Sequence, residues 1–160
     1  MELLFQNGVN YVLDSNRVGN KLHVYILCIA KKPDKTLPST CDRYDLSETY
    51  FNITGATSDA IKIVKRLAAH EISALQPEVK KKVGEYMLLG SATFHIQRKE
   101  WQPLLKIKGR RIENKGEIQD LLLQQSILKI HTFPTVLRAT EFALEFGEKL
   151  VNKQVPGLKV

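Results

Sequence analysis

The pattern of apolar positions near the start of the chain predicts a small antiparallel sheet. Residues 22–30 form a nearly continuous apolar run that is rich in β-branched and aromatic side chains, which is typical of a central strand. Before this run, Asn7-Gly8 separates two short apolar segments, and this arrangement is a strong hairpin signal. A second turn is expected over residues 16–20. The chain is therefore expected to begin with a three-stranded meander.

Helical spacing of apolar residues predicts helices in most of the remaining chain. In residues 58–75, apolar side chains recur every three or four positions, and Thr57 or Ser58 could cap the first turn. An Asn114–Glu117 pair matches a capping box. The four helices expected from such patterns are residues 58–75, residues 78–89 after Pro77, residues 115–125, and residues 134–151 opened by Pro134.

Two further patterns complete the expected fold. Residues 93–97 and 104–108 predict a second hairpin, and residues 50–54 predict a strand that follows a loop over residues 31–45. We therefore expect an α+β fold, in which an antiparallel sheet made of the meander and the later hairpin is covered by about four helices. One globular domain is expected over residues 1–152, followed by a tail over 153–160.

Charge is distributed unevenly along this expected fold. The 160 residues carry a formal net charge of +7, which favours a polyanionic partner. Residues 1–55 and residues 116–160 are each neutral overall, whereas residues 56–115 hold thirteen Lys and Arg against six Asp and Glu. If these cations gather on one surface of the folded chain, that surface would bind a phosphate backbone.

The segment 91–115 is the centre of this basic region. Its strand alternation would place Lys106 and Lys108 on one face, with Arg98 and Lys99 at the hairpin connection. The sequence thus predicts a non-enzymatic protein that binds DNA or RNA through its phosphate backbone. The expected contacts are Arg98, Lys99, Trp101, Lys106, Lys108, Arg110, Arg111 and Lys115, with Lys80, Lys81 and Lys82 as a second set.

Trp101 has two interpretations. Beside these cations, its ring could stack on an exposed base, as aromatic side chains do in single-strand binders. Tryptophan is more often substantially buried, and the sequence favours a core position for the Trp101 side chain considered alone.

The order of predicted elements also matches a winged helix-turn-helix. Helices over 58–75 and 78–89, followed by a hairpin, would place Lys80, Lys81 and Lys82 near a DNA backbone. A helical pair that simply packs on a sheet explains the same order, and we favour it because the N-terminal meander is foreign to the simple motif.

Two other functions remain open at this point. The first is a protein-interaction or assembly module with an acidic partner, and the apolar stripe of residues 134–151 also admits a homo-oligomer. The second is a metal-dependent nuclease, because Glu113 and Lys115 have the Glu-x-Lys form in which a carboxylate holds Mg²⁺. A second carboxylate in a suitable setting is missing, so no catalytic residue, metal or cofactor is expected.

The remaining signals concern compartment. Cys28 lies in the apolar run and Cys41 in a polar segment, and two cysteines are too few for a disulfide scaffold. The first residues lack the features of a signal peptide, and no apolar run reaches the roughly 18 residues that a membrane span needs. A cytoplasmic location without membrane contact is therefore expected.

Overall fold

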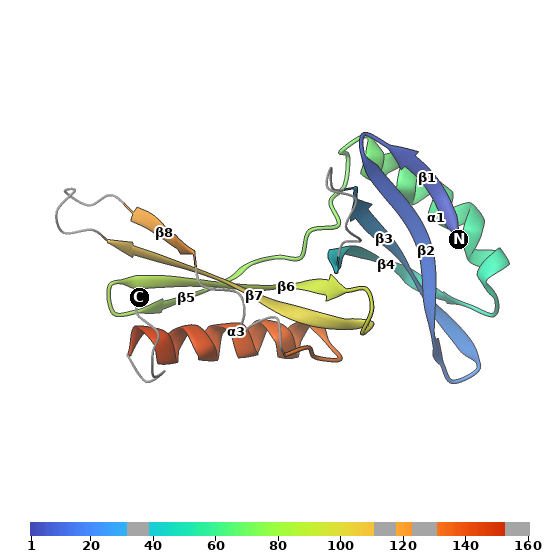
Figure 1. The fold of residues 1–160 in the computed structure, drawn as a ribbon. Coiled ribbons are helices and arrows are strands. Elements are labelled where there is room, and N and C mark those ends of the chain that lie inside the picture. The colour runs from blue at the N-terminus through green and yellow to red at the C-terminus, as the bar shows by residue number, and fades with distance from the viewer. Residues whose placement is uncertain (32–38, 111–117, 123–130, 153–160) are drawn as a thin grey trace. The chain divides into compact units, whose positions relative to one another are not determined.

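The computed structural model describes residues 1–31, 39–110, 118–122 and 131–152. The chain divides into two compact units, unit 1 over Met1–Leu75 and unit 2 over Gln76–Val160. Figure 1 labels the helices and strands of both units along the chain.

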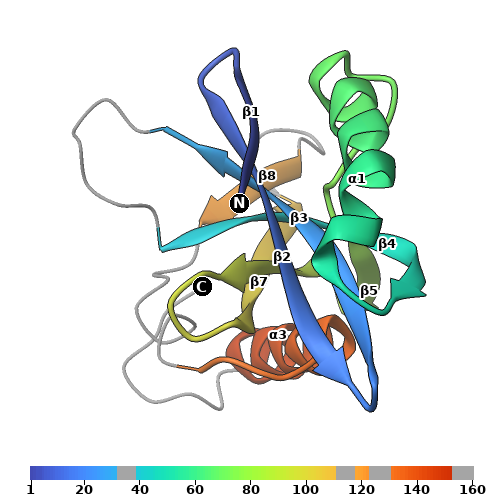
Figure 2. The ribbon, with the colours of Figure 1, turned by 90° about the vertical axis from the view of Figure 1, so that its right-hand side faces the viewer.

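Unit 1 consists of a four-stranded antiparallel sheet and one helix. Each strand pairs with the next one along the chain, and the helix lies against one face of the sheet (Figure 2). The elements are β1 (Glu2–Gln6), β2 (Val9–Val18), β3 (Lys21–Ala30), β4 (Thr40–Tyr50) and α1 (Ile53–Ala68).

The turns of the meander lie where the sequence predicts them. Asn7 and Gly8 both have positive φ, 55° and 76°, which is the conformation of a two-residue hairpin turn with the right twist. Gly19 has a φ of 64° at the turn between β2 and β3. The expected three-stranded meander is confirmed.

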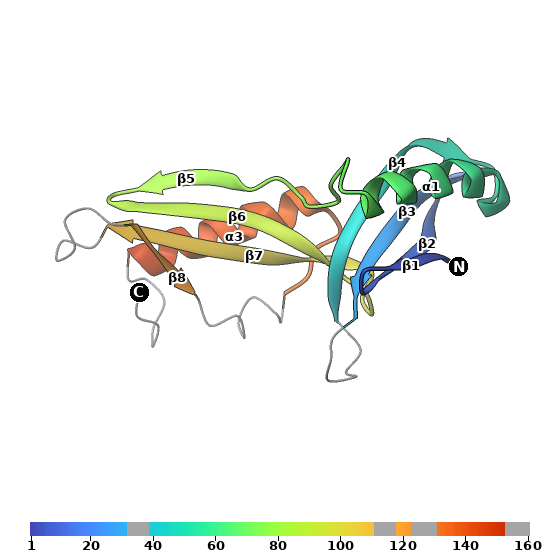
Figure 3. The ribbon, with the colours of Figure 1, turned by 90° about the horizontal axis from the view of Figure 1, so that it is seen from above.

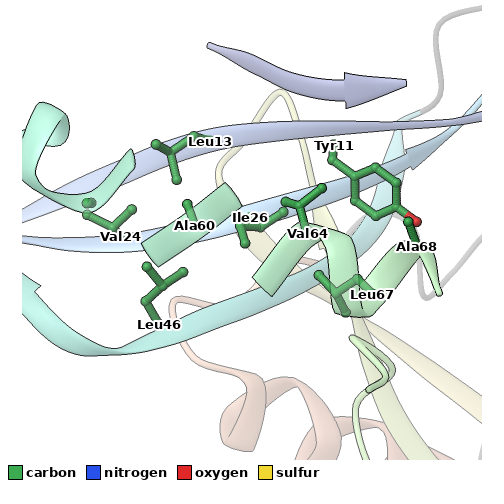
Figure 4. Packing of buried hydrophobic residues seen from close by; sticks show 10 residues of the cluster. Tyr11, Leu13, Val24, Ile26, Leu46, Ala60, Val64, Leu67 and Ala68 are labelled. Atoms are coloured by element: carbon green, nitrogen blue, oxygen red, sulfur yellow. The ribbon is translucent and has the colours of Figure 1, made fainter. Parts of the chain in front are cut away.

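The core of unit 1 lies between the sheet and α1. Alternate residues of the strands, such as Leu13 and Ile26, point toward Ala60 and Val64 of α1, as Figure 4 shows. Val24 and Ile26 are fully buried, so replacing either with alanine would cost about 2–5 kcal/mol of stability.

The strand and helix that complete unit 1 both begin earlier than predicted. The strand expected over 50–54 is wrong, because β4 occupies Thr40–Tyr50 and α1 begins at Ile53. The loop expected over 31–45 is wrong from residue 40 on, where β4 begins. Residues 32–38 lie outside the described part. The aspartates in this segment had indicated a loop. One of them, Asp45, is accommodated in β4 because its side chain accepts two hydrogen bonds from the Arg43 guanidinium. Asn52 caps α1, since its Oδ1 accepts from the backbone N–H of Gly55 at 2.8 Å.

The described residues of unit 2 also form four antiparallel strands and a helix. The strands again pair in chain order, and the helix α3 runs along the sheet, as seen from above in Figure 3. The elements are β5 (Val79–Val83), β6 (Tyr86–His95), β7 (Glu100–Arg110), β8 (Ile118–Leu122) and α3 (Val136–Val151).

Two of the four predicted helices are strands in unit 2. The expected helix over 78–89 is replaced by β5, a turn at Gly84 with φ 60°, and the beginning of β6. The expected helix over 115–125 is replaced, where the chain is described, by β8, which pairs with β7. The expected capping pair, Asn114 and Glu117, lies outside the described residues. Loss of the helix over 78–89 also removes the winged helix-turn-helix interpretation.

The last predicted helix and the second hairpin are present. Pro134 is not the first residue of α3, which begins at Val136; Thr135 caps it, because its Oγ1 accepts from the backbone N–H of Arg138 at 3.2 Å. The helix packs closely because β6 has a glycine beneath it: a Cβ on Gly90 would meet Leu144 Cγ at 2.8 Å. The hairpin is longer than predicted, with β6 and β7 joined by a short turn over 96–99.

The expected fold class therefore needs correction. The described residues hold two helices and are mostly antiparallel strand, so an antiparallel sheet covered by about four helices is wrong. The two units share one element order, four strands followed by a helix. The single domain expected over 1–152 stays a prediction, and the tail over 153–160 lies outside the described residues.

Candidate nucleic-acid interface

Strand alternation in unit 2 separates the candidate cations between two faces of the sheet. Leu88 and Ile107 pair with each other and pack with Ala143 and Leu150 of α3, so the odd-numbered residues of β7 face the helix. The neighbouring residues Lys106 and Lys108 of β7 therefore point to the opposite face.

The same rule sorts the three consecutive lysines of β5. Lys81 pairs in register with Leu88 and points toward α3, where its Nζ lies 2.7 Å from Glu148 Oε2. Lys80 and Lys82 must then point away from α3. We call the face that these alternate positions share the lysine face; its members are Lys80, Lys82, Lys106 and Lys108.

The lysine face has a regular spacing. Register places Lys80 and Lys106 on either side of Leu89, and Lys82 and Lys108 on either side of Met87. Lysines in the same strand are about 7 Å apart, and those across β6 are about 10 Å apart. Leu89 is buried and Met87 half-buried. The aliphatic parts of the lysine side chains can therefore lie beside these apolar residues while their ammonium groups reach water.

One member of the lysine face, Lys106, has a described carboxylate within ion-pair distance. Glu78 Oε1 lies 3.9 Å from Lys106 Nζ, and both side chains are about half exposed, so this ion pair contributes little. Lys108 lies opposite Asp120 of β8 in the register.

Arg98 and Lys99 lie at the other end of β6 and β7. They occupy the turn, where Lys99 has a φ of 52° and the backbone N–H of Arg98 donates to His95 Nδ1 at 3.2 Å. Burial and the neighbouring Arg98 charge lower the pKa of His95, which favours the neutral ring that this hydrogen bond needs. His95 lies six positions after Leu89 in β6, so this turn is roughly 20 Å from the nearest lysines of the face.

Trp101 occupies the core of unit 2. Its side chain is 5% exposed and its ring makes an edge contact with Phe94 at 5.5 Å between centroids. Its backbone also pairs with Phe133. The ring is therefore not presented to a base, and Trp101 is left out of the interface proposed below.

The remaining candidates are only partly described. Arg110 is the last residue of β7, where its backbone pairs in register with Ile118 of β8. Arg111 and Lys115 lie outside the described residues, as does Glu113 of the nuclease alternative. Among the described residues, no group of three or more His, Cys, Asp or Glu could hold a metal ion.

The described cations of the basic region 56–115 are divided between the two units. Three of its cations, Lys62, Lys65 and Arg66, are exposed on α1 in unit 1, whereas the others described belong to unit 2. Within unit 2, Lys81 and the turn residues are separated from the lysine face. Within unit 2, the lysine face is the group of described cations that strand register brings together.

Unit 1 contains a polar cluster that sequence reasoning missed. The buried guanidinium of Arg43 stacks on the Tyr25 ring at 3.7 Å and donates to Asp45 Oδ1, which His23 Nε2 also contacts at 2.8 Å. Burial raises the pKa of Tyr25 to about 12. Once β3 and β4 are paired, their alternation would reveal this cluster, but the sequence had indicated a loop for β4.

Comparisons of the chain with models of known protein families, with curated proteins and with solved structures found no match. Neither helix of the described chain is long and apolar enough to span a membrane. Evidence on function therefore comes from the residues of this chain alone.

Proposed function

We propose that unit 2 binds nucleic acid, without catalysis, through the phosphate backbone and the lysine face. The observation that carries this proposal is the strand register, which gathers Lys80, Lys82, Lys106 and Lys108 on the side of the sheet that α3 does not cover. Ammonium groups in a regular two-by-two arrangement match repeated phosphates better than they match a single small anion.

The binding free energy would come mainly from counterion release. Each lysine that neutralises a phosphate releases a condensed cation from the nucleic acid, and this effect does not depend on base sequence. Flexible lysines act as point charges without fixed geometry. The lysine face therefore supports binding that is strongly salt-dependent and weakly sequence-specific.

The lysines of β5 have a second explanation. In the described chain β5 pairs only with β6, and lysines on an edge strand prevent association with the edges of other sheets. This explanation does not cover Lys106 and Lys108, because β7 has paired strands on both sides. The two pairs of lysines together favour a ligand.

The test compares two variants with the same net charge. One replaces Lys80, Lys82, Lys106 and Lys108 with glutamine, and the matched control replaces Lys62, Lys65, Arg66 and Lys149 with glutamine. Fluorescence anisotropy with a labelled oligonucleotide should show a loss of about 100-fold or more for the first variant at low salt, and a much smaller loss for the control. Equal losses would refute the proposal.

An acidic protein partner is the alternative outcome. In that case a complex would be recovered from a lysate after nuclease treatment at moderate salt, and purified protein would not bind oligonucleotides. Retention of oligonucleotide binding by the purified chain would exclude this alternative as the explanation of the lysine face.

A further inference from the structure

Two phenylalanine side chains of unit 1 are exposed beside a lysine. Phe5 is 58% exposed and Phe51 is 73% exposed, which are large values for apolar rings. The ammonium of Lys31 lies 5.8 Å from the centroid of Phe5, and that of Lys21 lies 5.1 Å from the centroid of Phe51. Each pair offers an aromatic ring and a cation at the same place.

The first pair belongs to the sheet face that α1 does not cover. Leu4 packs in the core under α1, so its neighbour Phe5 in β1 points to the other face. Phe5 pairs in register with Asn10 of β2, which pairs in turn with Ile29 near the end of β3. Lys31 follows β3, where its backbone N–H donates to Gly8 O at 2.8 Å.

The second pair lies at the opposite end of β3. Leu22 packs in the core under α1, so Lys21 points away from the helix. Because Leu22 pairs with Tyr50, the next residue, Phe51, lies opposite Lys21. Ile29 lies seven positions after Leu22 in β3, so the two ring and lysine pairs are about 23 Å apart.

Packing in unit 1 does not account for these rings. An exposed cation–π contact contributes only about 0.5–1 kcal/mol, and more than half of each ring surface still reaches solvent. Phe51 precedes the cap residue of α1, yet its exposure excludes the apolar contact that a residue at this position often makes with the first helical turn. The rings therefore remain available to a ligand.

The chemistry of each pair suits an unpaired nucleotide. A base stacks on an aromatic ring, and an adjacent ammonium neutralises the phosphate; both contacts tolerate any base. A duplex keeps its bases stacked inside and offers no free face to a phenylalanine. We propose that unit 1 binds single-stranded nucleic acid by stacking bases on Phe5 and Phe51, with Lys31 and Lys21 at the neighbouring phosphates.

This inference rests on the proposed function. It extends that function by specifying a single-stranded nucleic acid as the ligand and by adding a second binding region in unit 1. The two regions make different contributions. The lysine face responds to phosphates in any strand, whereas the ring and lysine pairs respond only to unpaired bases. Separate substitutions can therefore test them in the full chain.

The experiment uses conservative changes at the two rings. One variant replaces Phe5 and Phe51 with leucine, which keeps the apolar character and removes the ring. A second replaces both with tyrosine, which keeps the ring. A matched control replaces Leu137, an exposed apolar residue of α3 (64% exposed), with alanine. Anisotropy is measured with a labelled oligothymidine and with a duplex of the same length.

The leucine variant should bind oligothymidine about fivefold or more weakly for each ring lost, with unchanged affinity for the duplex. The tyrosine variant and the Leu137→Ala control should match the wild type on both ligands. Equal losses on single strand and duplex, or no loss on either, would overturn the inference. Circular dichroism of each variant checks that the fold is retained.

Crosslinking identifies the contact directly. An oligonucleotide in which thymine is replaced by iodouracil is irradiated with the wild-type protein, and peptides are analysed by mass spectrometry. Adducts at Phe5 or Phe51 are expected, and adducts confined to unit 2 would overturn the inference. If the lysine-face variant loses binding while the leucine variant does not, the proposed function stands without this extension. If the wild type binds neither oligonucleotide, both fail.

Discussion

Lys81 Nζ lies 2.7 Å from Glu148 Oε2 and joins β5 to the last turns of α3, on the face of the sheet opposite to Lys80 and Lys82. Three consecutive lysines thus have two different environments. The pair is about half exposed, so its own contribution to stability is small. The contact shows that the Lys81 side chain points toward α3, so strand alternation directs Lys80 and Lys82 to the opposite face.

The first prediction compares neighbours in β5. Lys82→Gln should weaken nucleic-acid binding and reduce the slope of log affinity against log salt by about 0.9 on duplex DNA, because one phosphate contact is lost. Lys81→Gln removes the same charge from the other face and should leave that slope unchanged. Equal slopes in the two variants would contradict the assignment of faces.

The second prediction concerns the approach of α3 to β6. A Cβ on Gly90 would lie 2.8 Å from Leu144 Cγ and 3.2 Å from the backbone oxygen of Thr140, so Gly90→Ala should lower the free energy of unfolding by about 1–3 kcal/mol. Gly55→Ala in α1 is the control, since its nearest contact is 3.5 Å and alanine favours a helix. Urea unfolding of both variants measures the difference, and a neutral Gly90→Ala would contradict the packing.

The third prediction concerns the polar cluster of unit 1. Arg43→Lys keeps the charge but loses the planar group that stacks on Tyr25 and donates twice to Asp45. We expect it to cost about 2 kcal/mol of stability, with Arg43→Ala costing at least as much. Chemical unfolding measures the loss. Wild-type stability in Arg43→Lys would show that the stacking contributes nothing.

The fourth prediction concerns the two cysteines. Burial raises the pKa of both the Cys28 and Cys41 thiols to about 12, with further contributions from Asp42 to both and from Cys28 to Cys41. Above about pH 8.5 the unfolded chain loses these protons while the folded chain retains them, so stability should fall as pH rises from 9 toward 12.

Two measurements check this behaviour. Unfolding by urea at pH 7 and pH 10.5 should show lower stability at the higher pH. A thiol reagent such as Ellman's reagent should react slowly with the native protein and rapidly with both cysteines in denaturant. Rapid reaction of the native protein would contradict the burial of these thiols.

Local signals in the sequence predicted part of the fold correctly. The hairpin at Asn7-Gly8 was predictable because a two-residue turn with positive φ selects asparagine and glycine. The stripe of α3 was predictable because its apolar residues keep helical spacing over sixteen residues. Neither inference needs information about distant residues.

The strand β5 could not be predicted in the same way. Val79 and Val83 are four residues apart, which suits a helix face as well as alternate positions of a strand. The three lysines hide the alternation, because Lys81 lies on the side of α3 and contacts Glu148, a residue 67 positions away in the sequence. Pairing across such a distance decides the structure, and a local pattern does not contain it.

The candidate site was also predicted only in part from the sequence. Alternation in β7 correctly placed Lys106 and Lys108 together, since strand side chains alternate regardless of the partner. The addition of Lys80 and Lys82 required the β5–β6 hairpin. Phe5 and Phe51 were missed because an apolar residue in a strand is expected inside, and only the packing of α1 shows which face is uncovered.

The central claim is that four lysines of β5 and β7 act together on phosphates. It is tested most directly by the salt dependence of duplex binding between 50 and 200 mM salt, measured for the wild type, the lysine-face glutamine variant and the α1 and α3 control variant of equal charge. The account predicts that the slope of log affinity against log salt becomes shallower by about 3–4 in the lysine-face variant and stays near the wild-type value in the control. The same slope in both variants would contradict it.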